Sequence, residues 1–230
     1  MIKLKPNKER SKQAVLAMKF VLVASGLMLF AQGYTVKLLM DIENGNYLSL
    51  GSGENYLIGI GIIGFLFMVA FVFSAIFFIM WFRRAYFNLH QLVPGKLKYS
   101  EGWAAGAWFV PIFNLFGPYQ IAFDLHKNTE NLLIQNDLDT PDKSRFSTVG
   151  WWWGLWITSS VISQVSNNMD DLSTTGAWIA IIGSLISIGS GLMAIRMIQN
   201  YTKMEELLPQ INDVSARGGI DESDLLDSGI

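Results

Sequence analysis

Residues 108–128 read WFVPIFNLFGPYQIAFDLHKN, and their path relative to a lipid bilayer decides how the whole chain folds. No charge occurs between Glu101 and Asp124, at positions 102–123. About 20 apolar residues suffice for a transmembrane helix, so this run is long enough to cross. It also holds two prolines, an asparagine and a glutamine, which a lipid-facing helix accommodates poorly. The stretch therefore crosses the membrane, lies on it, or enters and returns.

The composition of the chain is that of a membrane protein. Of its 230 residues, 51% are hydrophobic and 16% are charged, against about a quarter charged in ordinary soluble domains. The net charge of −2 gives no reason to expect nucleic acid as a partner. Because cysteine is absent, disulfides, thiolate metal sites and cysteine nucleophiles are excluded.

Four segments are apolar and long enough to be membrane spans. They are residues 14–36, 56–82, 148–165 and 176–195. We expect an all-α membrane protein with a bundle of four transmembrane helices. The bundle, residues 14–197, follows a basic amino terminus (1–13) and precedes an acidic, largely disordered tail (198–230).

The first span has a second interpretation. Five basic residues up to Lys12, an apolar run and the triplet Ala31-Gln32-Gly33 are also typical of a secretory signal peptide. The apolar run is longer than the usual core of such a peptide, which favours a retained helix.

Basic residues in the loops predict the orientation. The loop between the first two spans has only Lys37, and the loop between the last two has none, whereas seven basic residues lie between the second and third spans. By the positive-inside rule, both termini are then cytoplasmic. A crossing by residues 102–123 would invert the later spans. We therefore expect this segment to be re-entrant or interfacial, on the cytoplasmic side.

The two prolines divide residues 102–133 into two parts. Pro111 and Pro118 each remove a backbone donor, and Pro118 suits the first turn of a new helix. In that helix the spacing predicts two faces: Gln120, Asp124, Lys127 or Asn128, and Asn131 on one, and Tyr119, Ala122, Phe123 and His126 on the other. Such a helix rests on the membrane or against the bundle.

Tryptophans gather near the expected cytoplasmic surface. Amphipathic indole rings favour the headgroup layer, so these side chains are predicted interfacial anchors, with an aromatic ligand cage as the alternative. They are Trp81, Trp103, Trp108, Trp151, Trp152 and Trp153.

The third span is unusually polar for a membrane helix. Its hydroxyl and amide side chains either bond within the bundle or line a hydrophilic path. They are Thr158, Ser159, Ser160, Ser163 and Gln164.

One pattern in the chain resembles a known family. Residues 84–89 read R-x-x-x-N-L, and residues 102–120 read G-W-A-x-x-x-W-F-V-P-x-x-N-L-F-x-P-Y-Q, followed by Asp124. This order resembles a family of bacterial multi-pass membrane proteins known as domain of unknown function 4328. The resemblance implies a multi-pass fold in the bacterial cytoplasmic (inner) membrane, with no established activity, substrate or cofactor.

Polar residues of this pattern form the candidate ligand- or lipid-binding cluster. They are Arg83, Arg84, Asn88, Asn114, Gln120 and Asp124. We expect Arg83 or Arg84 to pair with Asp124, and Asn114 to satisfy carbonyls freed by the break. The cluster either holds the broken segment in place or binds an anionic headgroup or small ligand, because paired arginines suit phosphate.

No catalytic, cofactor or metal motif accompanies these residues. His90 and His126 lack a third ligand of suitable spacing. We therefore expect a non-enzymatic membrane protein, a small scaffold or accessory subunit that binds lipid or another membrane protein, including a second copy of itself. A transporter or channel subunit is the alternative, and a membrane enzyme comes third.

Overall fold

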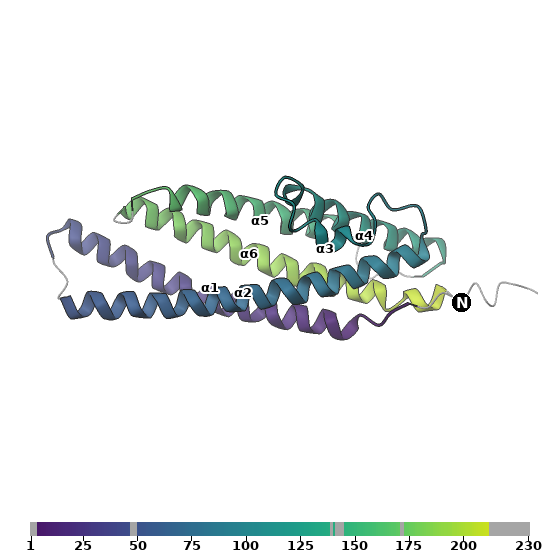
Figure 1. Ribbon diagram of the computed structural model, residues 1–230, viewed down its shortest axis with the longest axis horizontal. Helices are drawn as coiled ribbons and strands as arrows, with labels where there is room; N and C mark the ends of the chain where they lie inside the picture. The colour runs from purple at the N-terminus through teal and green to yellow at the C-terminus, as the bar shows by residue number, and fades with distance from the viewer. Residues whose placement is uncertain (1–3, 47–49, 139, 141–144, 171–172, 212–230) are drawn as a thin grey trace, which may run out of the picture.

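The computed structural model describes residues 4–46, 50–138, 140, 145–170 and 173–211, and this part of the chain is all-α. Figure 1 labels its elements. The α-helices are α1 (Lys8–Glu43), α2 (Leu50–Leu92), α3 (Trp103–Gly106), α4 (Gly117–Gln135), α5 (Arg145–Asn167) and α6 (Thr174–Glu205), and a 3-10 helix, η1, covers Phe113–Leu115.

In the part of the chain that the structure describes, three helical segments are long and apolar enough to cross a membrane: Lys8–Glu43, Gly53–Leu92 and Thr174–Ile211. These segments indicate a multi-pass membrane protein, as the sequence predicts. The third predicted span, residues 148–165, lies within α5, which is not among these three segments.

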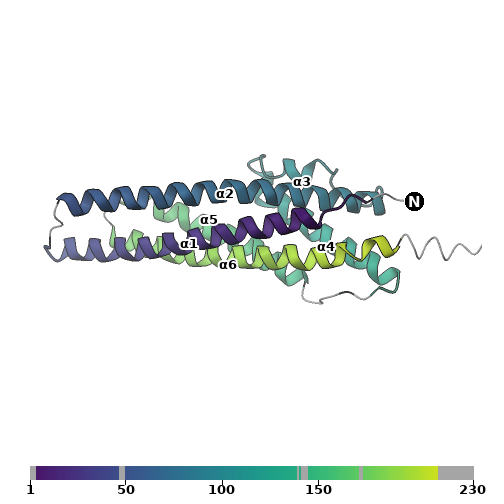
Figure 2. The same cartoon turned by 90° about the horizontal axis from the view of Figure 1, so that it is seen from below.

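The four long helices α1, α2, α5 and α6 run side by side along one axis (Figures 1 and 2). At one end, the hydroxyls of Ser11 and Thr202 lie 2.6 Å apart. At the other end, Thr174 Oγ1 donates to Glu43 Oε1 over 2.6 Å. These contacts make α1 and α6 antiparallel over nearly their whole lengths.

One half of the molecule, which we call the stem, exposes its apolar side chains. It comprises residues 16–43, 53–77, 154–170 and 173–193. Large apolar residues there are mostly open, with Phe30 82% and Val23 65% exposed. Such a surface requires lipid or protein around it.

The other half, which we call the head, has a core of its own. It comprises residues 4–15, 78–138, 148–153 and 194–211. Its largest fully buried side chains include Trp81, Tyr86, Ile121, Leu125 and Tyr201. In Figure 1 the head lies at the end where α3 and α4 cover the long helices. Residues 198–211, predicted to belong to the tail, are thus part of the head, and residues 212–230 lie outside the described chain.

The head changes the interpretation of three tryptophans. Trp81 is fully buried, and Trp152 and Trp153 are 5% and 7% exposed. Their rings contact protein, so the predicted anchoring role is wrong for these three. Trp103 is 39% and Trp151 61% exposed, and both remain predicted anchors. Trp108 is partly buried against Trp153, with ring centroids 6.1 Å apart.

Residues 102–123 do not form one continuous helix. α2 ends at Leu92, and Gly95 turns the chain with φ of +73°. The four-residue α3, several turns and η1 then follow, and α4 carries Pro118 in its first turn, as the sequence predicts. We call residues 102–116 the broken segment. α4 packs against α5 and α6, and its buried face includes Ile121, Leu125 and Thr129.

Candidate functional site on the head

The structure divides the predicted polar cluster into four separate environments. Arg83 and Arg84 line a cavity beside the amino terminus, and Asn88 lies in the core. Gln120 and Asp124 are on α4, while Asn114 is in η1. No ion pair joins either arginine to Asp124 within the described ranges, so the expected pair is wrong.

Asn88 of α2 bonds both to the amino-terminal segment before α1 and to the end of α6. Its Oδ1 accepts from the Lys5 amide over 2.9 Å, and its Nδ2 donates to the Lys5 carbonyl over 2.9 Å. Nδ2 also lies 2.8 Å from Glu205 Oε1. With 1% of its surface exposed, Asn88 is a structural residue of the head.

Glu205 is the centre of this buried network. Besides Asn88, it accepts from Asn7 Nδ2, which lies 2.9 Å from Oε2. On the surface nearby, Lys8 Nζ pairs with Glu206 Oε1 at 2.8 Å. A partly buried carboxylate gains from such donors, because an unpaired charge is costly away from water. Sequence analysis missed Glu205, although it lies four residues after the buried Tyr201 and so shares its helix face.

Arg83 and Arg84 face a cavity of about 250 Å³. The other lining residues are Lys5, Arg10, Phe87 and Glu101. Arg10 Nη1 donates to the Met80 carbonyl over 3.0 Å, which fixes it at the cavity wall. Four cations and one carboxylate therefore surround this space.

Gln120 and Asp124 have different partners from those expected. Gln120 Oε1 accepts from the Tyr99 hydroxyl and, over 3.1 Å, from Lys98 Nζ. Partial burial raises the pKa of the Asp124 carboxyl above its ordinary value, while Lys127 and Lys98 oppose that shift. These residues stabilise the contact of α4 with the loop before it.

A tryptophan side chain satisfies one of the backbone carbonyls in the broken segment. Trp153 Nε1 donates to the Leu115 carbonyl over 3.2 Å. To satisfy a freed carbonyl, Asn114 would have to donate from its Nδ2, and among the described residues this amide donates to no carbonyl, while its buried Oδ1 also has no donor. The expectation that Asn114 satisfies the break is therefore not supported, and an indole from α5 does so instead.

The tip of the broken segment is strongly exposed and apolar. Phe109 and Ile112 are 75% and 77% exposed, and Leu115 is 59% exposed. Behind the tip, Trp108 packs against Phe78 of α2 and Trp152 of α5, with centroids 5.6 Å and 6.4 Å apart. The tip therefore projects from a rigid aromatic base near the boundary between head and stem.

The hydroxyls of α5 bond mainly to their own helix. Thr158 donates to the Gly154 carbonyl over 2.8 Å, and Ser159 and Ser160 donate to the Trp156 carbonyl over 2.9 Å and 2.8 Å. Such bonds satisfy a hydroxyl in an apolar setting without a water-filled path. They agree with the packing interpretation of this span.

The two histidines each contact a backbone carbonyl. His90 Nε2 lies 3.0 Å from the Tyr99 oxygen, and His126 Nδ1 lies 2.8 Å from the Ala122 oxygen. Among the residues that the structure describes, no group of three His, Cys, Asp or Glu residues could hold a metal ion.

Comparison with known proteins gives one match. The model of the family described as "Domain of unknown function (DUF4328)" matches residues 59–203, from α2 to the end of α6. No curated protein and no solved structure matches the chain.

Proposed function

Because the chain belongs to the DUF4328 family, whose description names no activity, we propose a function from its geometry. The protein is a non-enzymatic, multi-pass membrane protein. It is a small scaffold or accessory subunit whose head is held against the bilayer by the broken segment. The observation that carries this proposal is the exposed apolar tip beside the apolar stem.

The proposed topology has four crossings. Contacts at both ends make α1 and α6 antiparallel, and α1 and α2 run antiparallel in Figures 1 and 2. α2 therefore ends at the head, whereas α6 begins at the far end of the stem. If both helices cross, the chain between them must also cross back, and α5 is the helix that does so.

Both ends of the described chain then lie on the head side. The excess of Lys and Arg on that side supports a cytoplasmic head, and the bacterial inner membrane is the proposed location. The length of Gly53–Leu92 also fits: 40 residues extend about 60 Å, twice the bilayer core of about 30 Å. Residues 53–77 of α2 extend about 37 Å and span the lipid, and residues 78–92 belong to the head.

Lipid is the proposed environment of the tip. In water, fully burying Phe109 or Ile112 would be favourable by about 2 kcal/mol each, so their exposure favours a surrounding apolar phase. The tip lies close to the end of the stem, where lipid headgroups would meet the head. In this position it is interfacial or shallowly re-entrant.

Single cysteines test this placement, because the natural chain contains none. Ile112→Cys, Phe65→Cys and Asn131→Cys would each be labelled with an environment-sensitive fluorophore and reconstituted in phosphatidylcholine vesicles. Nitroxide lipids would then report depth by quenching. We expect strong quenching by shallow nitroxides at 112, by deep nitroxides at 65, and little quenching at 131.

Two outcomes would contradict the proposal. If position 112 were as unquenched as 131, the tip would face water or a protein partner. If the isolated protein, as a monomer in liposomes, conducted a solute or ion, the transporter alternative would replace the scaffold. Mass spectrometry of lipids and proteins retained in a mild detergent distinguishes a lipid environment from a protein partner.

A further inference from the structure

The seam between α1 and α2 contains an unneutralised cationic cavity. Its positive side chains are Lys5, Arg10, Arg83 and Arg84, against the single carboxylate of Glu101. Among the described residues, none of these four cations forms an ion pair with a carboxylate. An anion in this cavity would therefore relieve mutual repulsion.

Two of the four cations are positioned by contacts of their own. Arg10 is bonded to the Met80 carbonyl, and Lys5 Nζ lies 3.9 Å from the centre of the Phe87 ring. The positive charges of Arg83 and Arg84 are close enough to repel that of Arg10. Glu205 attracts Arg84, but its carboxylate already accepts from Asn7 and Asn88. The cavity thus brings three guanidinium groups together, and such groups suit phosphate.

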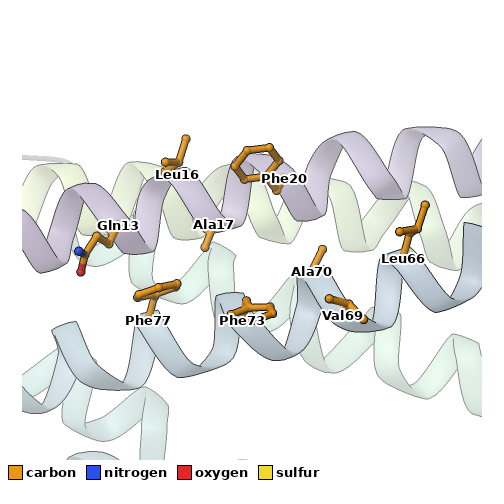
Figure 3. A pocket seen from close by; sticks show the side chains of 9 residues that line it. All are labelled: Gln13, Leu16, Ala17, Phe20, Leu66, Val69, Ala70, Phe73 and Phe77. Carbon is orange, nitrogen blue, oxygen red and sulfur yellow. The ribbon is translucent and has the colours of Figure 1, made fainter.

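An open apolar groove lies along the same seam (Figure 3). It has a volume of about 350 Å³. Its lining residues are Gln13, Leu16, Ala17 and Phe20 of α1 and Leu66, Val69, Ala70, Phe73 and Phe77 of α2. Apart from Gln13 at the end nearest the head, every lining side chain is apolar.

Helix geometry places the groove and the cavity one after the other along the same seam. On α1, Arg10 precedes Gln13 by three residues, and on α2, Arg84 follows Phe77 by seven, so each pair shares a helix face. From Leu66 to Phe77 the groove extends about 16 Å, roughly the depth of one leaflet of a bilayer core of about 30 Å. The groove therefore fits an acyl chain, and the cavity lies where that lipid would carry its headgroup.

We propose that this seam binds one anionic glycerophospholipid of the leaflet nearest the head. Its phosphate contacts the Arg10, Arg83 and Arg84 guanidinium groups, and one acyl chain lies in the groove against Phe20, Phe73 and Phe77. This site goes beyond the proposed function: it needs the stem in a membrane, but it does not involve the broken segment.

Native mass spectrometry of the full chain in dodecylmaltoside provides the test. Dioleoyl phosphatidylglycerol, dioleoyl phosphatidylcholine and inorganic phosphate are titrated separately. We expect phosphatidylglycerol to bind at least tenfold more tightly than phosphatidylcholine, which lacks the net negative charge. Inorganic phosphate, which lacks the chains, is expected to compete only at concentrations at least a hundredfold higher.

Variants separate the two parts of the site. Arg83→Gln/Arg84→Gln is expected to weaken phosphatidylglycerol binding at least tenfold, and Lys127→Gln/Lys203→Gln, which changes the net charge equally, less than twofold. Arg83→Gln alone is the milder variant if the double variant does not fold, because Arg83 is exposed. Ala70→Leu fills the groove and is expected to weaken binding of both lipids several-fold, whereas Val72→Leu, outside the groove, is not.

Equal binding of the two lipids would overturn the proposal. So would unchanged phosphatidylglycerol binding in the arginine variants. Competition by inorganic phosphate at lipid-like concentrations would assign the cavity to a soluble anion instead. Because none of these variants alters the tip, loss of this site and loss of quenching at position 112 are separate results.

Discussion

The stem and the head are built from the same long helices but are stabilised in different ways. In the stem, Phe30, Val23 and Leu57 are each more than 60% exposed. In the head, Trp81, Tyr86 and Tyr201 of α2 and α6 are fully buried. The stem therefore leaves its apolar surface to the surrounding lipid, whereas the head buries its own.

The polar side chains of the two halves also differ in their partners. Several hydroxyls of the stem bond to carbonyls one turn earlier in their own helix, as Ser25 does to Val21 over 2.8 Å, and others link two helices, as Thr174 does to Glu43. In the head, Asn88 and Asn7 bond to segments far away in sequence and meet at the Glu205 carboxylate. The head therefore has a shared polar network that joins three segments of the chain.

The largest difference in stability between head and stem is expected when a phenylalanine in each is replaced by alanine. Phe78, 4% exposed, packs against Trp81, Phe82, Trp108 and Trp152. Phe78→Ala should lower the free energy of unfolding by about 3–5 kcal/mol, because it leaves a cavity. Phe30→Ala in the stem should leave the melting temperature in detergent almost unchanged. Similar melting shifts in the two variants would contradict the distinction between head and stem.

Buried asparagine should give the next largest effect. Asn88→Ala removes the donors and acceptor that serve Lys5 and Glu205, and it should cost about 2–3 kcal/mol of unfolding free energy. Asn168→Ala is the matched control, since among the described residues that exposed side chain bonds to the Gln164 carbonyl alone. Thermal melting of both proteins in detergent measures the difference, and a small effect of Asn88→Ala would show that the network is dispensable.

Gly117 tests the packing of the broken segment. A Cβ at this position would overlap the Phe113 ring, which packs against Trp103 with centroids 4.8 Å apart. Gly117→Ala should therefore cost about 1–2 kcal/mol by overpacking. Gly154→Ala, where a Cβ meets nothing within 4 Å, is the control on α5. Equal melting temperatures would mean that Phe113 moves aside freely.

The smallest effect concerns pH. Because burial raises the folded-state pKa of Asp124, the folded protein holds that proton more tightly than the unfolded chain. Stability then falls as pH rises from the ordinary aspartate pKa through the folded value. Asp124→Asn should melt slightly higher than the natural protein at pH 7, with the gap closing in acid. A gap that widens in acid would reverse the sign of the inferred pKa shift.

Local signals in the sequence were sufficient to predict where α2 ends and where α4 begins. Pro94-Gly95 marks the end of α2, and Pro118 falls in the first turn of α4, because proline and glycine restrict the backbone locally. Pro111 and Pro118 likewise indicate that 102–123 is not one helix. The partners of Asn88 and of the Leu115 carbonyl could not be predicted, because Glu205 and Trp153 come from distant parts of the chain.

The sequence by itself determined the all-α membrane class, three of the four predicted spans and the family to which the chain belongs. These properties follow from hydropathy, helix length and local order, which short stretches of sequence carry. The tertiary structure alone decided that Trp81, Trp152 and Trp153 are core residues, and that Arg83 and Arg84 line a cavity with Arg10 and not with Asp124. Side-chain burial and partners depend on which helices pack together, and that packing is set by contacts between segments far apart in the chain.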